Sequence, residues 1–316
     1  MEKMLIKDGK TLAKLTGSWY ENSLFSRIET DIENETFELG KTIGQNIIDH
    51  AFTVLEASNP NDTEKETLRL IQISVGLMAV YRYFQSNLVS HEGNGRKMKI
   101  DSQNEKMAWE WMIERDDNSH LLKAQRAQDR LIEHLEKNNV ESFNDSEERK
   151  DLKSLFLNNT RKFEYYFPID LSGRFYHVVS PLIREIQDTY IADAFEEDYL
   201  PFLGRFQKDE LNEADKLLIG FVCRAEALYT IALACRRFSL TVLPQTVVKK
   251  IKAAIQTTEA TKEAAAKEID RYIYELEKDA CEHLNKLKRQ RYKSSPEYTK
   301  RTLLPKNDPR QKFART

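Results

Sequence analysis

The chain has 316 residues, enough for one large domain or two of ordinary size. It contains only 10 glycines and 8 prolines, too few for the turns of a many-stranded sheet. Charged residues make up 32% and hydrophobic residues 40%, which suits amphipathic helices and excludes a disordered chain. The three cysteines, Cys223, Cys235 and Cys281, lack metal-ligand or redox spacing, and their odd number argues against a disulfide framework. We therefore expect a reducing compartment such as the cytosol.

The net charge of −2 conceals an asymmetry along the chain. From Lys286 onward there are eleven basic and two acidic residues, a net charge of +9, which leaves −11 on the remainder. An acidic body with a basic tail suggests that the tail has a partner of its own, although a solvated terminus is the alternative.

The first third of the chain predicts two helical regions. Residues 24–55 carry apolar side chains at roughly helical spacing, which predicts one helix. After a turn at 59–62, Thr63 is the predicted N-cap of a helix to about Ser86, with Glu66 as its capping-box partner. This second helix is apolar on nearly all its faces, which is typical of a helix at the centre of a bundle.

Three more helices are expected in the middle of the chain. The sequence predicts helices over about 102–115 and 119–137. Asp145 or Ser146 is expected to cap a third, which reaches Phe163.

The same order of elements then recurs. A helix is predicted over 179–195, and Asn212 is the expected N-cap of a long apolar helix over 213–237. We interpret this recurrence as an internal duplication, with an offset of 154 for the first helix of each unit and 148 for the central one. Arg224 and Glu226 near the middle of the apolar run argue for a buried helix and against a membrane span.

After Pro244 the chain changes character. Residues 258–292 predict one polar helix about 50 Å long, with a narrow apolar stripe that suits packing along a single partner. That partner is either the chain's own body or a neighbouring subunit. The stripe comprises Ile269, Ile273, Leu276, Ala280, Leu284 and Leu287.

These predictions give an all-α fold with two tandem copies of a helical-bundle unit, followed by a long C-terminal helix and an extended basic tail. The predicted boundaries are 1–140 and 141–256 for the two units, 257–292 for the polar helix and 293–316 for the tail.

The basic tail is the candidate partner-binding site, whether the partner is a neighbouring subunit or another protein. Its candidate residues are Lys288, Arg289, Arg291, Tyr292, Lys300, Arg301, Lys306, Arg310 and Phe313. A group of aromatic residues is expected around the joint of the two units, mostly as core and partly as subunit interface. This group comprises Trp109, Trp111, Tyr165, Tyr166, Phe167, Phe175 and Tyr176.

No motif predicts catalysis. The six histidines form no H-x-x-x-H or H-E-x-x-H pattern, there is no G-x-S-x-G, and no cysteine lies in a nucleophile motif. The acidic runs Glu147-Glu148 and 196–198 are interpreted as solvated helix faces, because a di-metal bundle would need Glu-x-x-His motifs. We expect no catalytic residues, no metal and no cofactor.

Five segments carry a resemblance to a known family. They are Met4-Leu5-Ile6-Lys7-Asp8, 28–39, 68–83, 163–170 and Tyr199-Leu200-Pro201-Phe202-Leu203-Gly204. Over about residues 4–252 the chain resembles a family encoded in phages and prophages of Bacteroidetes bacteria, beside capsid and portal genes.

The resemblance implies a head–tail connector (adaptor, head-completion) protein. Such proteins are small helical bundles that form a ring, usually of twelve copies, beneath the portal protein. The implied partners are further copies of the chain, the portal, a tail or stopper protein, and DNA that passes through the lumen without sequence-specific binding. The implied location is the head–tail junction of the virion, after synthesis in the bacterial cytoplasm, with no membrane contact. The doubled unit and the long polar helix depart from ordinary adaptors, which leaves the ring stoichiometry open.

Three other classes of protein stay open. A host intracellular helical-repeat scaffold would present a binding groove between its repeats. A nucleic-acid-binding protein would use the tail, although the tail has few aromatic residues and no helix-turn-helix spacing. An enzyme ranks last, because no motif supports one.

Overall fold

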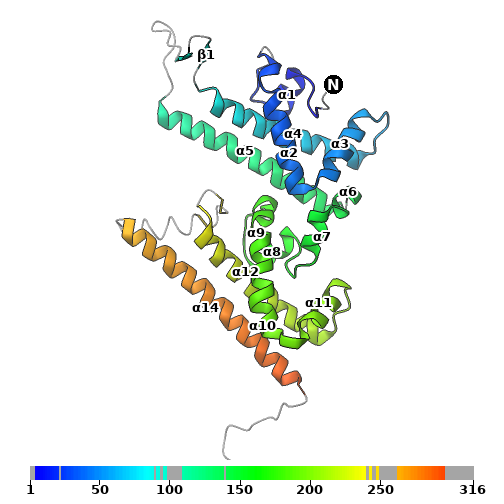
Figure 1. The fold of residues 1–316 in the computed structure, drawn as a ribbon, viewed down its shortest axis with the longest axis vertical. Helices are drawn as coiled ribbons and strands as arrows, with labels where there is room; N and C mark the ends of the chain where they lie inside the picture. Colours follow the sequence, from blue (N-terminus) through cyan, green and yellow to red (C-terminus); the bar gives the residue numbers. More distant parts are fainter. Residues whose placement is uncertain are drawn as a thin grey trace, which may run out of the picture.

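The fold is all-α, which confirms the predicted fold class, apart from a short β-hairpin of Ser90–Glu92 (β1) and Gly95–Lys97 (β2). Figure 1 shows an elongated molecule with two helical bundles, one above the other. This computed structural model describes residues 4–20, 23–88, 90–92, 95–97, 109–138, 140–239, 242–243, 247–248 and 262–295.

The first bundle is built around α4, and its buried side chains run from Leu5 to Phe143. Its helices are α1 (Gly9–Thr16), a 3-10 turn (Phe25–Arg27), α2 (Glu29–Ile43), α3 (Gln45–Glu56), α4 (Asp62–Ser86) and α5 (Glu110–Lys137).

The second bundle has a separate core, which runs from Leu152 to Leu287. Two short helices, α6 (Glu141–Asn144) and α7 (Glu147–Lys153), lead into it. Its remaining helices are α8 (Thr160–Tyr166), α9 (Gly173–Ile186), a π-turn (Gln187–Ile191), α10 (Ala192–Phe195), a 3-10 turn (Glu196–Asp198), α11 (Tyr199–Gln207), α12 (Glu213–Arg237) and α14 (Lys262–Ser294).

The predicted position of α4 at the centre of a bundle is confirmed, because α4 packs against α1, α2, α3 and α5. Its predicted N-cap is wrong. Asn61, not Thr63, accepts a hydrogen bond from the Glu64 backbone N–H at 2.8 Å, and the Glu64 carboxylate accepts one from the Asn61 N–H at 2.8 Å. Thr63 and Glu66 repeat the same spacing two residues later, so the spacing alone did not identify the cap.

The single helix predicted over 24–55 is wrong, because Gly44 divides it. Gly44 has a φ of 99°, and its N–H donates to the Gly40 carbonyl at 2.8 Å, which closes the last turn of α2. Only glycine enters this backbone region without steric cost. A β-carbon on Gly44 would also lie 2.7 Å from Cβ of Ser146.

The middle of the chain also differs from the prediction. The break expected between 115 and 119 is absent, and α5 runs unbroken because no glycine or proline interrupts it; the segment 102–108 lies outside the described residues. Ser146 is a helix cap, as predicted, but its helix α7 ends at Lys153. Asn159 caps the separate helix α8.

The predicted N-cap of α12 is confirmed. Asn212 forms a capping box with Asp215, and α12 spans Glu213–Arg237. Of the described helices, α12 alone is long and apolar enough to cross a membrane, but half of its most apolar window is buried inside the protein. It packs along α14 and α9, which accounts for its hydropathy as that of a core helix.

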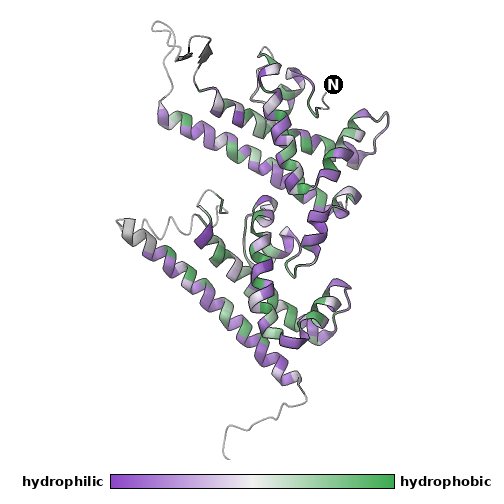
Figure 2. Cartoon of the chain, viewed as in Figure 1, coloured by the Kyte–Doolittle hydropathy of each residue, from purple (hydrophilic) through white to green (hydrophobic). Residues whose placement is uncertain are grey.

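The α14 stripe lies against α12 of the same chain. Ile273, Leu276, Ala280, Leu284 and Leu287 are buried in the second core, while Figure 2 shows hydrophilic residues along most of the rest of the helix. Of the two partners expected for the stripe, the structure shows the chain's own body. The use of this stripe in packing against a neighbouring subunit is not what the single chain shows, and such packing stays a prediction. The domain boundaries stay predictions, but α14 shares its core with α12 and is no separate body.

The two bundles match at one offset. The capping boxes at Asn61 and Asn212 lie 151 residues apart, and α4 and α12 both have 25 residues. At the same offset, Ile32 and Ile183 are both buried, as are Ile71 and Val222. The duplication and its two offsets of 154 and 148 stay predictions, and these features recur at 151.

The joint between the bundles depends on two carboxylates of α5 that cap helices of the second bundle. Asp129 accepts hydrogen bonds at 2.9 Å from both the Ser172 hydroxyl and the Arg174 N–H, at the start of α9. Glu136 accepts at 3.3 Å from the N–H and the hydroxyl of Thr160, at the start of α8. Burial raises the pKa of both carboxyl groups, while these hydrogen bonds act in the opposite direction.

A close backbone approach completes the joint. An ideal β-carbon on Gly173 would lie 2.5 Å from Cγ2 and 2.8 Å from Cβ of Ile132, closer than side-chain atoms pack. Since Ile132 is buried in the first core, it has no room to move away. Glycine at 173 is therefore required for α9 to meet α5.

We predict that Gly173→Ala lowers the free energy of unfolding by about 1–3 kcal/mol, the usual cost of overpacking. The measurement is chemical denaturation followed by circular dichroism. Gly220→Ala in α12 is the matched control, because nothing lies within 4 Å of its β-carbon; we expect it to raise stability by about 0.5–1 kcal/mol through helix propensity. Equal effects of the two substitutions would contradict the close approach.

Candidate partner-binding surfaces

The end of α14 carries the first predicted partner-binding residues, and it lines a cleft of about 660 Å³. Arg291 donates to the Ala194 carbonyl at 2.5 Å and to the Asp198 carboxylate at 2.6 Å, and its guanidinium lies 5.1 Å from the centre of the Phe195 ring. It thus supplies a cation to the C-terminal end of α10, where the helix dipole is negative. These contacts fix the last turn of α14 to α10.

Lys288 also contacts the body of the chain, with its Nζ 3.3 Å from a carboxylate oxygen of Asp193. Arg291 and Lys288 therefore have roles within the chain that the sequence prediction missed. Arg289 and Tyr292 are exposed, and Tyr292 lines the cleft. The other predicted residues, Lys300, Arg301, Lys306, Arg310 and Phe313, lie outside the described residues.

The opposite wall of this cleft is held by a bidentate ion pair. Arg205 donates to the two carboxylate oxygens of Asp215 at 2.8 and 3.0 Å, in the fork geometry that is strongest between these groups. The hydrogen bonds from Arg205 lower the pKa of Asp215. Because Asp215 is also the capping-box partner of Asn212, this pair fixes α11 to the start of α12.

One residue on the rim of the cleft has a strained backbone. Glu196 has a φ of 52° and a ψ of −129°, a region that glycine favours and that costs other residues about 1–3 kcal/mol. It follows the last residue of α10, as Gly44 follows the last residue of α2. Glu196 belongs to the acidic run that the sequence predicted as a solvated face, and its side chain is exposed.

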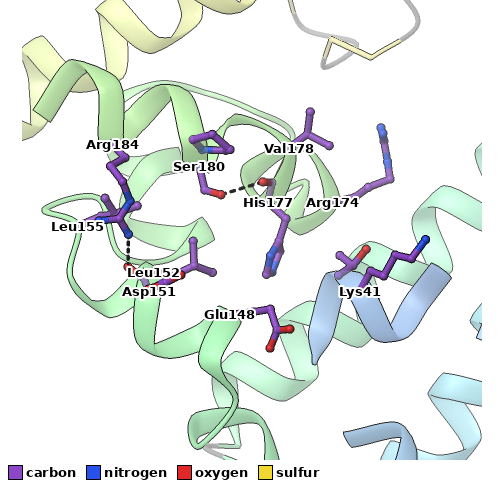
Figure 3. Close-up of a pocket in the computed structure, with 12 residues that line it drawn as sticks. Lys41, Glu148, Asp151, Leu152, Leu155, Arg174, His177, Val178, Ser180 and Arg184 are labelled. Carbon is purple, nitrogen blue, oxygen red and sulfur yellow. Dashed lines mark hydrogen bonds between the residues drawn. The ribbon is translucent and has the colours of Figure 1, made fainter. Parts of the chain in front are cut away.

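A second cleft, of about 460 Å³, lies at the boundary of the bundles (Figure 3). Lys41 comes from α2, Glu148 and Asp151 from α7, and His177 and Arg184 from α9. Ser180 donates to the backbone carbonyl of His177 at 2.8 Å, and Arg184 donates to the Asp151 carbonyl at 2.9 Å. The Ser180 hydroxyl is therefore committed to a carbonyl and not to the imidazole, so the two residues do not form a nucleophile and base pair.

His177 is neutral at physiological pH. Burial, assisted by the positive charge of Arg149, lowers its pKa to about 4, and its Nε2 has no hydrogen-bond partner in the described part of the chain. In Figure 3 its ring points toward the floor of the cleft, on the side of Glu148. The cleft thus offers charged groups of both signs around an uncharged imidazole, which suits contact with a protein surface.

The described residues contain no group of three or more His, Cys, Asp or Glu side chains that would hold a metal ion. Burial also raises the pKa of the Cys223 thiol, and that of Cys235 to about 11. Both groups are protonated at neutral pH, whereas a catalytic cysteine needs the thiolate.

The sequence missed a buried acid at the centre of the second core. Glu226 of α12 has no exposed surface, and among the described residues only the Leu157 backbone acts on its carboxyl group as a hydrogen-bonding group. Burial raises its pKa well above the ordinary value of 4.5, and the positive charge of Lys162 offsets this only in part. A raised pKa favours the protonated carboxyl, which avoids a buried charge.

Glu226 lies near a buried loop whose backbone is bound by side chains. The Phe156 N–H donates to Gln187 Oε1 at 2.9 Å, and the Tyr176 hydroxyl donates to the Leu157 carbonyl at 2.8 Å. A loop inside a core needs such partners, because its own backbone groups have no helical ones.

The predicted aromatic group at the joint is correct only in part. Phe175 and Tyr176 are fully buried, but Tyr165 is exposed, and so are Trp109 and Trp111, which lie at the start of α5. The two tryptophans are at the far end of the first bundle, next to a third cleft between the end of α4 and the start of α5. Their position in the sequence predicted that they lie at the joint. They lie instead at the start of α5, and the joint is formed by the other end of that helix.

The comparisons with known proteins add no relative. No protein-family model, no curated protein and no solved structure matches the chain. The resemblance to the phage connector family therefore rests on the sequence segments alone.

We predict that Glu226→Gln raises stability at pH 8 and that the gain shrinks toward pH 4.5. The pKa of Glu226 is higher in the folded state than in the unfolded chain. Its contribution to the stability of the wild type is therefore fully present below pH 4.5. That contribution is lost as the pH rises, because the carboxyl group ionises more readily in the unfolded chain. Urea denaturation between pH 4 and 8 measures this. Glu282→Gln, an exposed position on α14, is the control and should change nothing with pH. If the difference in stability between Glu226→Gln and the wild type did not change with pH, a raised pKa of Glu226 would be refuted.

We also predict that Glu196→Gly raises the free energy of unfolding by about 1 kcal/mol, because relief of backbone strain exceeds the added freedom of the unfolded chain. Thermal denaturation checks the effect. The neighbouring Glu197→Gly should lower stability, since Glu197 does not have a positive φ. If both variants were destabilised alike, the strain at position 196 would be excluded.

Proposed function

We propose that the chain is a structural virion protein, a head–tail connector (adaptor) that forms a ring under the portal and links capsid to tail around the DNA channel. The observation that carries this proposal is the capped joint, in which carboxylates of the first bundle accept hydrogen bonds from the first residues of two helices of the second. A ring subunit needs a body that keeps its shape under load, and two cores connected by such directional hydrogen bonds meet that need.

The charge distribution supports the same proposal. An acidic body repels DNA phosphates, so a duplex would slide through a lumen and not adhere to its wall. The basic cluster is confined to the end of α14 and the tail, and two of its residues are already paired with Asp193 and Asp198. The remaining positive charge is available to a partner.

The proposal implies a specific set of partners. These are further copies of the chain in a ring, usually of twelve, the portal protein above it and a tail or stopper protein below it. DNA would pass without sequence-specific binding. The protein would act in the virion after synthesis in the host cytoplasm, without catalysis, cofactor or membrane contact.

A host intracellular scaffold protein is the second candidate. The cleft of about 460 Å³ at the boundary of the bundles favours it, because side chains from both bundles line that cleft, as in the grooves between helical repeats. Such a protein would act as a monomer that binds a segment of its partner.

Assembly of the purified chain tests the proposal. We expect rings in negative-stain images, a mass of about twelve copies by light scattering, and binding to the portal protein encoded by the same genome. A chain that ends at Tyr292 should melt cooperatively like the wild type and yet fail to join the portal, because it lacks the tail. A wild-type chain that stays monomeric at all concentrations would instead favour the scaffold.

A further inference from the structure

The end of the first bundle carries an exposed groove that no contact within the described chain fills. We call it the tip groove; its volume is about 510 Å³. Its lining residues are Tyr83, Phe84, Asn87, Leu88, Met112, Ile113, Asp116 and Asp117.

The tip groove lies within an apolar surface. Leu88 is 58% exposed, and beside the lining residues Trp109 and Trp111 are 70% and 55% exposed. Exposed tryptophans are uncommon on surfaces that face only water and are enriched where proteins bind one another. We therefore expect a protein segment to bind over this apolar surface.

The rim of the groove is acidic. Asp116 is largely exposed, with a carboxylate oxygen 3.6 Å from His120 Nε2, while Asp117 accepts a hydrogen bond from Gln85 at 2.9 Å. The same stretch of α5 adds Glu110 and Glu114 and a single base, Arg115. An occupant that combines apolar side chains with positive charge would match this groove.

The C-terminal segment of the chain has this chemistry. Residues 296–316 hold six basic and two acidic residues. Lys300 and Arg301 precede the pair Leu303-Leu304, and Lys306 follows it. The leucines suit the apolar floor, the bases suit the acidic rim, and an arginine suits the face of an exposed tryptophan.

The segment and the groove lie at opposite ends of the elongated molecule. The start of α5 lies near the top of Figure 1, whereas α14 ends near the bottom, where Arg291 fixes it to α10. Two copies arranged end to end bring the tail of one to the groove of the next. Such a heterologous contact repeats from copy to copy and forms a closed ring if the rotation permits, or a filament if it does not.

We propose that residues 296–316 of one copy bind in the tip groove of the next copy, through Leu303 and Leu304 on the apolar floor and Lys300 and Arg301 on Asp116 and Asp117. This contact rests on the proposed ring and names the surfaces that would build it. Of the two kinds of partner expected for the basic tail, it names a neighbouring copy, on which assembly of the ring that meets the portal would depend.

Charge reversal tests the contact in the full-length chain. We expect Asp116→Lys with Asp117→Lys to lower self-association at least 10-fold, and Lys300→Glu with Arg301→Glu to do the same, because each double variant places like charges together. The four substitutions in one chain should restore assembly, and so should an equimolar mixture of the two double variants. Sedimentation velocity measures the association, and circular dichroism shows that each variant is folded.

The controls separate this contact from general effects of charge. Glu282→Lys changes an exposed acid on α14 and should leave association unchanged. A fluorescent peptide of residues 296–316 should bind the full-length chain, and its affinity should fall at least 10-fold with Trp111→Ala. Assembly by the Lys300→Glu, Arg301→Glu variant at the wild-type level would overturn the inference, as would association lost in both double variants but not regained in the combined chain.

The outcome also distinguishes this inference from the proposed function. Rings that persist in both double variants would refute the tail contact and leave the connector proposal standing. A chain that forms no ring, but binds the peptide in a manner that depends on Asp116 and Asp117, would support the contact and count against the connector. A monomer whose own tail occupies its own groove would show no binding of the peptide, and that result would refute the copy-to-copy contact.

Discussion

The structure depends on one arrangement, in which carboxylates of α5 hydrogen-bond to the first residues of α8 and α9. A helix begins with N–H groups that lack partners within it, and Asp129 and Glu136 accept from these groups across the boundary of the two cores. The side-chain and backbone donors are arranged around each carboxylate, so the direction of α9 relative to α5 is fixed as well as its distance. The absence of a side chain on Gly173 then lets α9 approach Ile132 of α5 closely.

The cores and the ends of the molecule have different roles. The two cores use apolar side chains on nearly every face of α4 and α12, and they leave the outer faces of α5 and α14 to charged residues. The two ends differ. The free end of the first bundle exposes tryptophans beside acids, while the end of the second bundle is closed by Arg291 and Arg205 in ion pairs. The two ends of the molecule therefore differ in chemistry, which suits head-to-tail assembly.

Helical periodicity predicted the fold class, the central position of α4 and the bounds of α12, because these follow from local pattern and from apolar residues on all faces. It failed where two local signals competed or where tertiary contacts decided. Thr63 and Asn61 both offer a capping box, and only the turn before α4 selects Asn61. Gly44 broke a helix that the apolar spacing alone joined. For the candidate site, the sequence identified basic residues but not that Lys288 and Arg291 pair with acids about 95 positions away.

The separate cores have a mechanical consequence. Force applied along the long axis passes from one bundle to the other through the caps, the glycine contact and ion pairs such as that of Arg161 with Glu133, since the two apolar cores of the described residues are separate. Hydrogen bonds weaken steeply once donor and acceptor move apart or out of line, and close-packed cores transmit strain with little compression. Under small loads the joint therefore holds the two bundles at a fixed distance and direction, as a rigid coupling between them.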